Sequence, residues 1–192
     1  MDKKFIVIYS SKYGTTKGYA ERVADALGCD AVPADACDFG ALSDFDCIVY
    51  GGWIRGGGIV GLNRLKPHAA EIADRLVIFA TGISTDMPTV VEEVKGVNFD
   101  DAIKDVPLVL CGGKYDPKTA SAFDKMLMGI AKMIVKGKDE NGAKMKNRLN
   151  VGSDLREEDG DLKILKEVEK ITGLHLCGAS TPGDDHDRRS DL

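Results

Sequence analysis

A cluster of hydroxyl side chains around one glycine, between residues 10 and 16, has the composition of a phosphate-binding loop. The cluster consists of Ser10, Ser11, Lys12, Tyr13, Gly14, Thr15 and Thr16. It follows the continuous apolar run 5–9 and precedes an alanine-rich helical pattern at 17–27. The first N–H groups of a helix are free to bind an anion, and the helix dipole favours negative charge at the same end. These seven residues are therefore predicted to hold a phosphate.

Two further clusters follow later apolar runs and are candidates to hold the rest of the ligand. The first comprises Gly52, Trp53, Ile54, Arg55, Gly56 and Gly57, and contains the only tryptophan of the chain. The second comprises Thr81, Gly82 and Ile83. An aromatic side chain in a glycine-rich loop can stack on a flat ring, and a guanidinium can stabilise negative charge on that ring. We expect Trp53 to contact such a ring, with Ile54 as the alternative residue on that face and Arg55 beside it.

Three kinds of phosphate ligand can be compared with these clusters. ATP and GTP are disfavoured because the chain has no Gly-Lys-Ser or Gly-Lys-Thr, whose lysine reaches the outer phosphates. Residues 56–61 match the dinucleotide pattern G-x-G-x-x-G, but a run of glycines meets it by chance and residues 53–55 separate it from the preceding strand. Flavin mononucleotide (FMN) carries a monoester phosphate, which needs several short donors and little positive charge. The hydroxyls at 10–16 meet that need.

Five apolar runs alternate with helical patterns, which is typical of an α/β fold with a mainly parallel sheet. Strands are expected at 5–9, 29–33, 46–52, 76–80 and 106–111, and helices at 17–27, 62–73, 88–105, 119–135 and 161–173. Four of the strands end in clusters of Gly, Ser or Thr. Ligands of such sheets bind beyond the carboxyl ends of the strands, which meet at one edge. The clusters are therefore expected to line one site.

The segment after the fifth strand is expected to add an amphipathic helix and then a polar loop over 136–150. Residues 126–150 hold six Lys or Arg against Asp139 and Glu140. This charge indicates either a solvated loop or a docking surface for an acidic partner or a membrane surface. Residues 1–177 are predicted to form one domain, and the tail 178–192, which is poor in apolar residues, is predicted to be disordered.

Composition argues against several classes of function. The chain has 192 residues and a net charge of −5, which disfavours nucleic-acid binding because that needs a basic face. Five scattered cysteines without a C-x-x-C pattern, and no leader before the first strand, indicate reduced thiols in a cytoplasmic protein. The histidines form no triad-like arrangement with Cys or carboxylate residues, so neither a metal site nor a catalytic acid or base is predicted.

Three motifs, in order, resemble those of the flavodoxins, a family of FMN-binding proteins. Ser11-Lys-Tyr-Gly-Thr-Thr16 is similar to the flavodoxin phosphate loop, Tyr50-Gly-Gly-Trp-Ile-Arg-Gly-Gly57 is similar to the second flavin loop, and Thr81-Gly-Ile-Ser84 falls at the third. The resemblance implies FMN as the cofactor and a three-layer fold with strand order 2-1-3-4-5. It also implies that a glycine peptide in the second loop turns its carbonyl towards the flavin on reduction, a role open to Gly52 and residues 56–58.

Within this family, the chain looks most like the menaquinone-dependent protoporphyrinogen oxidase branch. The similarity covers residues 5–135 and includes Phe123-Asp-Lys-Met-Leu-Met-Gly-Ile-Ala-Lys-Met133. It implies an FMN-dependent oxidoreductase or an electron carrier whose partner is a quinone, a porphyrinogen-like substrate or a protein. The alternatives are an NAD(P)H-dependent FMN quinone reductase and a flavodoxin-fold interaction or signalling module without a cofactor. A phosphate-accepting signalling domain needs acidic residues at the ends of the first and third strands, where this chain has Ser and Gly.

Overall fold

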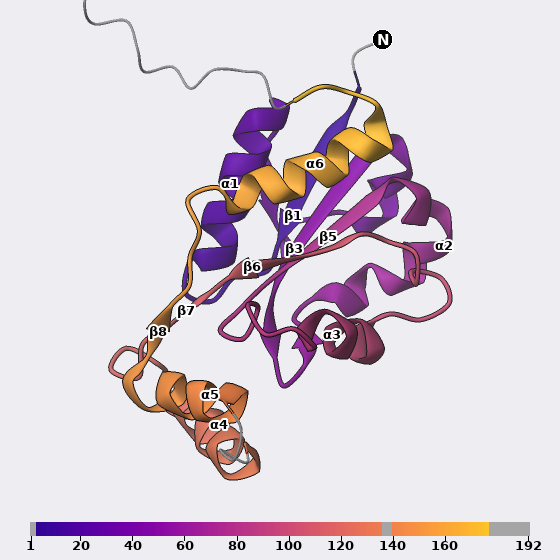
Figure 1. The fold of residues 1–192 in the computed structure, drawn as a ribbon. Coiled ribbons are helices and arrows are strands. Elements are labelled where there is room, and N and C mark those ends of the chain that lie inside the picture. The colour runs from indigo at the N-terminus through magenta and orange to yellow at the C-terminus, as the bar shows by residue number, and fades with distance from the viewer. Residues whose placement is uncertain (1–2, 136–139, 177–192) are drawn as a thin grey trace, which may run out of the picture.

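Five parallel strands form the central sheet of the protein, described from a computed structural model that covers residues 3–135 and 140–176. The strands are β1 (Phe5–Tyr9), β2 (Ala31–Pro33), β3 (Cys47–Arg55), β5 (Leu76–Gly82) and β6 (Leu108–Gly112). They lie in the order β2-β1-β3-β5-β6, and every neighbouring pair is parallel (Figure 1). The predicted order 2-1-3-4-5 is therefore confirmed, because the shorter strands β4, β7 and β8 lie off this path.

Helices cover both faces of the sheet, which gives the three predicted layers (Figure 1). α1 (Thr15–Leu27) and α6 (Gly160–Thr172) pack on one face, against Val7, Val49 and Phe79. The other face carries α3 (Val90–Asn98) and a series of short elements. These are η1 (Phe39–Asp44), η2 (Leu62–Arg64), η3 (Lys66–His68), α2 (Ala69–Ile72) and η4 (Ala73–Arg75). Because both faces are covered, the strands are apolar on both sides.

Two predicted helices are shorter than their apolar patterns suggest. The helix expected at 62–73 is a series of 3-10 turns around the four-residue α2. Pro67 lies in its middle, where it lacks the N–H of a regular helix and its ring clashes with the preceding turn. The helix expected at 88–105 is confined to α3, and Asp100 Oδ1 accepts a hydrogen bond from the Ala102 N–H in the turn that follows.

The glycine-rich segment after the third predicted strand is a β-hairpin and not an irregular loop. β3 continues to Arg55, and β4 (Gly58–Ile59) folds back antiparallel to it. The two turn residues, Gly56 and Gly57, have φ values of 58° and 84°, as a two-residue type I′ turn requires. The hairpin therefore places Trp53 on a strand, where its position is fixed by the ladder.

A helical excursion projects beyond the carboxyl ends of the strands, at the lower left of Figure 1. It consists of α4 (Ala122–Ile134) and α5 (Glu140–Val151). The strands β7 (Lys114–Tyr115) and β8 (Ser153–Asp154) pair antiparallel at its base. Neither of these helices, nor any other within the described ranges, is long and apolar enough to cross a bilayer.

The polar loop predicted over 136–150 is wrong for residues 140–150, which belong to α5. The pattern of this segment is mostly polar, so it gives a weak helical signal. The helix gains its support from tertiary contacts, because Arg148 and Leu149 are buried at its end. Residues 136–139 and the predicted tail at 178–192 lie outside the described residues.

Candidate functional site

A cavity of about 110 Å³ lies at the carboxyl ends of the strands, where the three predicted clusters meet. The β1–α1 loop, the tip of β3 and the end of β5 form three of its sides, and α4 lies across it. The residues that line it are Ser11, Lys12, Tyr13, Thr15, Thr16, Trp53, Ile54, Arg55, Thr81, Gly82, Ile83, Gly113, Lys114, Tyr115, Asp124, Leu127 and Met128. This edge is where ligands bind in open parallel sheets.

The β1–α1 loop and the first residues of α1 line this cavity. Gly14 immediately precedes α1 with a φ of 88°, a conformation that favours glycine. Ser11 Oγ accepts a hydrogen bond from the Gly14 N–H at 3.2 Å, which fixes the turn. Within the described chain no side chain caps α1. Its first N–H groups are therefore available to an anion, which the helix dipole also favours.

Two hydroxyls in the cavity wall join the first cluster to the third. Thr16 is 1% exposed, and its Oγ1 lies 2.8 Å from Oγ1 of Thr81 at the end of β5. The mutual bond uses only one of the two hydroxyl hydrogens, so the other can be donated to a ligand. Low exposure strengthens such a bond relative to one made in water. The pair therefore offers a buried donor beside the uncapped N-terminus of α1.

Trp53, Ile54 and Arg55 end β3 at the mouth of the cavity. Trp53 is half-buried and pairs with Thr81 in the β3–β5 ladder. Ile54 packs on Gly82, where an added Cβ would lie 3.1 Å from the isoleucine Cδ1. Arg55 is exposed, and it forms no ion pair with any residue that the structure describes. The strand thus supplies one aromatic, one aliphatic and one unpaired cationic side chain to the same opening.

The buried amide of Asn98 holds the β3–β4 hairpin against α3. Its Nδ2 donates to the Gly57 carbonyl at 2.8 Å and to the Val94 carbonyl at 2.7 Å. Its Oδ1 accepts from the Ile59 N–H at 2.7 Å. The Gly57 carbonyl is therefore fixed, whereas a Cβ added at Gly56 would meet nothing within 4 Å. Of the two turn glycines, Gly56 has the less constrained surroundings.

The start of α4 is tied to the phosphate-binding loop by two side chains of that loop. Lys12 Nζ donates to Asp124 Oδ2 at 2.6 Å and to Ser121 Oγ at 3.0 Å. The Tyr13 hydroxyl donates to the same carboxylate and accepts from the Ser121 N–H at 2.9 Å. Burial pushes the pKa of Asp124 upward, but the hydrogen bonds from Lys12 and Tyr13 outweigh it and leave that pKa below its ordinary value. The bond to Asp124 raises the pKa of Lys12.

A second attachment joins α5 to the end of β5. Arg148 donates to both carboxylate oxygens of Asp86 and to the Ile83 carbonyl, each at 2.7 Å. Lys144 Nζ adds a contact of 2.7 Å to Asp86. The hydrogen bonds from Arg148, and then that from Lys144, hold the pKa of Asp86 well below its usual range. The α4–α5 excursion is therefore fixed on two sides of the cavity.

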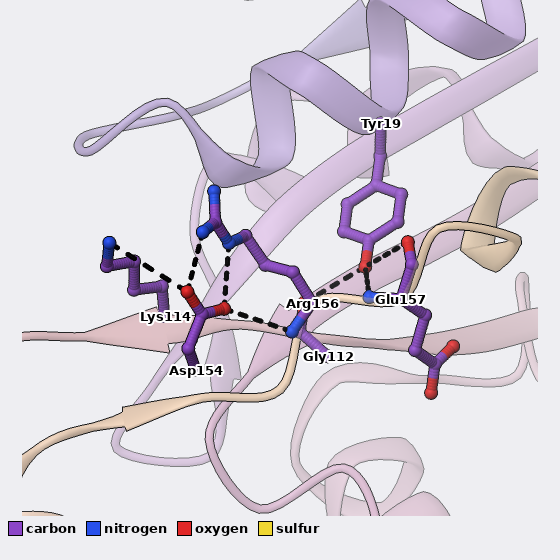
Figure 2. Close-up of polar contacts among 6 residues, drawn as sticks. All are labelled: Tyr19, Gly112, Lys114, Asp154, Arg156 and Glu157. Carbon is purple, nitrogen blue, oxygen red and sulfur yellow. Dashed lines mark hydrogen bonds and ion pairs between the residues drawn. The ribbon is translucent and has the colours of Figure 1, made fainter.

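A larger cavity, of about 850 Å³, lies on the other side of the phosphate-binding loop. Several of its polar side chains are paired with one another (Figure 2). Asp154 accepts from Arg156 at 2.7 and 2.6 Å and pairs with Lys114 at 3.8 Å. The Tyr19 hydroxyl accepts from the Glu157 N–H at 2.9 Å. Thr16, Trp53 and Thr81 line only the smaller cavity, so the smaller cavity is the better candidate site.

Most of the predicted site residues line the smaller cavity; five do not. Gly14, Gly56 and Gly57 shape the turns beside it through their backbone. Ser10 turns away, and its Oγ lies 3.0 Å from the Tyr50 hydroxyl. A Cβ on Gly52 would lie 2.6 Å from Ile59, so glycine permits the return of β4 at that position. The binding roles of all sixteen predicted residues, those that line the cavity included, remain predictions.

Sequence reasoning missed six residues of the cavity wall. Gly113, Lys114 and Tyr115 follow β6, and the Gly-Gly-Lys cluster at the end of that strand was a usable signal. Asp124, Leu127 and Met128 lie on α4. No sequence pattern shows that α4 reaches back over the edge of the sheet, because this depends on the contacts of Lys12 and Tyr13.

Comparison with known proteins gives one match to a family. A model of the flavodoxin domain matches residues 6–141, which is most of the chain. A search of curated proteins finds no match.

Several solved structures are similar at low sequence identity. A flavodoxin from the domain Archaea is 16% identical, with a TM-score of 0.37 over 76% of this chain and 98% of that one. A WrbA-like flavodoxin from Agrobacterium tumefaciens is 15% identical, with a TM-score of 0.42 over 78% and 94%. The flavodiiron core from Synechocystis is 17% identical, with a TM-score of 0.43 over 77% of this chain but only 36% of that one. At these low TM-scores the likenesses carry no weight, and the family assignment rests on residues 6–141.

Proposed function

The chain belongs to the flavodoxin domain family, and on that premise we propose that it binds FMN in the cavity at the strand ends and transfers electrons. The observation that carries this proposal is the composition of one cavity. It joins an uncapped helix N-terminus and a buried hydroxyl pair, which suit a phosphate, to half-buried Trp53, which suits a flat ring. FMN, when bound, supplies the redox chemistry itself.

The protein's part in this proposal is to bind and orient the cofactor. The first N–H groups of α1 and the Thr16–Thr81 pair would hold the phosphate without a full positive charge. Trp53 and Ile54 would contact the ring, and exposed Arg55 would favour negative charge on it. The α4 residues Leu127 and Met128 would exclude water from one side. No side chain needs to act as an acid or a base.

The finer parts of the proposal rest on the sequence resemblance. They are the protoporphyrinogen oxidase branch, a quinone or porphyrinogen-like partner, and action as an oxidoreductase rather than as a carrier. Residues 1–177 would act as one domain. A cytoplasmic location agrees with the free thiols of Cys29, Cys37, Cys47 and Cys111.

An absorption spectrum and an FMN titration test the cofactor. We expect the purified protein to be yellow, or to quench FMN fluorescence stoichiometrically when it is supplied without cofactor. Riboflavin, which has the same ring and no phosphate, is the matched ligand control and should bind more weakly. A colourless protein that leaves FMN fluorescence unchanged would refute the proposal and favour the interaction module.

A further inference from the structure

Helix α4 exposes an apolar stripe on a side that does not face the cavity. Its members are Phe123, Met126, Ile130, Met133 and Ile134, with exposed fractions of 53%, 54%, 47%, 86% and 70%. At 100° per residue, these five fall within an arc of roughly 100°. Residues 124, 127 and 128, on the adjoining side of the same helix, line the cavity. One helix therefore joins the candidate site to an apolar surface.

Basic residues are frequent in the segment that carries this stripe, in an otherwise acidic protein. Lys125, Lys132 and Lys146 form no ion pair with any residue in the described part of the chain. Residues 126–150 hold six Lys or Arg and two acidic residues, a charge of +4, in a chain whose net charge is −5. The remaining residues therefore carry −9. Positive charge is concentrated at the excursion that bears the stripe.

We propose that α4 binds the surface of an anionic lipid bilayer through this stripe. Apolar side chains of a surface helix insert at the boundary of head groups and acyl chains, and flanking lysines contact anionic head groups. A second copy of the chain fits less well, because two basic excursions would repel each other. Phe123, Met126 and Met133 would also suit a protein interface, but the lysines of this segment favour the bilayer, because protein interfaces are depleted of lysine.

The proposal has a consequence for the site, which rests on the proposed function. Leu127 and Met128 line the cavity from the helix that would lie at the bilayer. A bilayer-soluble electron acceptor or donor, such as a quinone, would then reach the cavity from the α4 side without leaving the membrane surface. The larger cavity beside Tyr19 lies on the other side of the phosphate-binding loop and has no part in this.

Co-sedimentation of the full chain with lipid vesicles tests the proposal. We expect binding to vesicles of phosphatidylcholine mixed with phosphatidylglycerol, weaker binding to phosphatidylcholine alone, and release by added salt. Ile134→Asp should weaken binding by more than about tenfold, since it removes an inserted apolar side chain and adds a negative charge. Lys125→Gln, at an exposed lysine of α4, should weaken it by about fivefold.

Matched controls come from α6, the helix that packs on the central sheet, because it also has an exposed apolar residue and an exposed lysine. Leu162 is 43% exposed and Lys166 is exposed, so Leu162→Asp and Lys166→Gln should leave vesicle binding unchanged. Equal losses in the α4 and α6 variants, or no vesicle binding by the unaltered protein, would overturn the proposal. A third result would also overturn it: the protein does not bind vesicles but forms a dimer in size-exclusion chromatography, and Ile134→Asp dissociates that dimer.

The measurement does not depend on the cofactor, so the two proposals can fail separately. Vesicle binding is measured with and without added FMN, and far-UV circular dichroism checks that each variant is folded. Vesicle binding by a protein that never binds FMN would refute only the proposed function. FMN binding by a protein that does not bind vesicles would refute only the membrane proposal.

Discussion

At the scale of single residues, the Thr16–Thr81 pair is the part of the proposed site that would distinguish FMN from riboflavin. Thr16→Val removes one of the two hydroxyls and leaves the side-chain volume nearly unchanged. We expect FMN binding to weaken by about tenfold or more, because a hydrogen bond to a charged group contributes roughly 1.5–3 kcal/mol. Riboflavin binding should change much less. Flavin fluorescence titration measures both. Thr119→Val, an exposed threonine away from this cavity, is the control, and equal weakening of the two flavins would place Thr16 outside the phosphate site.

Trp53 is the residue whose removal should be visible in the spectrum of the bound flavin. Trp53→Ala should weaken FMN binding by a few-fold to about tenfold, because an aromatic contact contributes roughly 0.5–1.5 kcal/mol beyond its buried area. It should also increase the fluorescence of the bound flavin and shift its reduction potential. Phe123→Ala removes an exposed ring from α4 and serves as the control. If neither fluorescence nor potential changes, Trp53 is a packing residue of β3.

At the scale of elements, the β3–β4 hairpin depends on one amide from α3. Asn98→Ala would leave the Ile59 N–H and the Gly57 carbonyl without the partners they have now. We expect the free energy of unfolding to fall by about 1–3 kcal/mol, the cost of buried polar groups left unsatisfied. Urea denaturation measures the loss. Asn147→Ala, an exposed asparagine of α5, should change stability by less than about 0.5 kcal/mol. Similar losses in both variants would contradict a specific clamp.

The attachment of α4 to the phosphate-binding loop should persist across the neutral range and weaken outside it. The pKa of Asp124 is lowered on folding, so its contribution is present above the ordinary value of 3.8 and is lost as pH falls through the lowered pKa. The pKa of Lys12 is raised, so its contribution is present below the ordinary value of 10.5 and is lost as pH rises through the raised pKa. Between these limits the attachment is intact.

Hydrogen exchange of the first amides of α4 measures this attachment. Asp124→Asn should speed their exchange at neutral pH by a few-fold, because an ion pair that is partly exposed contributes up to about 1 kcal/mol. Glu167→Gln is the control, because it removes an ion pair within α6 that joins no other element. Unchanged exchange at α4 in Asp124→Asn would show that other contacts hold the helix.

The sequence was informative where local rules decide the structure. The apolar runs and Gly, Ser and Thr clusters predict the five central strands and most of the cavity wall. The predicted helix ends at 27 and 173 lie within one residue of the ends of α1 and α6, where Gly28 and Gly173 have positive φ. The pattern was uninformative where distant contacts decide. α5 is held by the hydrogen bonds from Arg148 to Asp86, and α4 is held over the cavity by the bond from Lys12 to Asp124. The local sequence pattern of either helix could not show these contacts.

At the scale of the whole molecule, the cofactor should contribute a large share of the stability. Binding to the folded state alone adds about 2.7 kcal/mol at a free ligand concentration one hundred times Kd. For a chain of this length, that corresponds to a rise in Tm of about 5–10 °C. Thermal denaturation with and without FMN measures it. Riboflavin at the same concentration should give a smaller rise, and the absence of a rise with FMN would contradict binding.

The two-stranded ladder of β7 and β8 allows the length and sequence of the segment between these strands to vary. It joins Lys114 to Asp154 and Tyr115 to Ser153, so the chain leaves the sheet and returns to it at neighbouring points. The part of the excursion that does not line the cavity can lengthen, shorten or be replaced without altering the spacing of the ends that the sheet requires. This outer part of the excursion is therefore replaceable. Evolution, or a protein engineer, can change the outer surface of the excursion, provided that Asp124, Leu127 and Met128 of α4 are kept at the cavity.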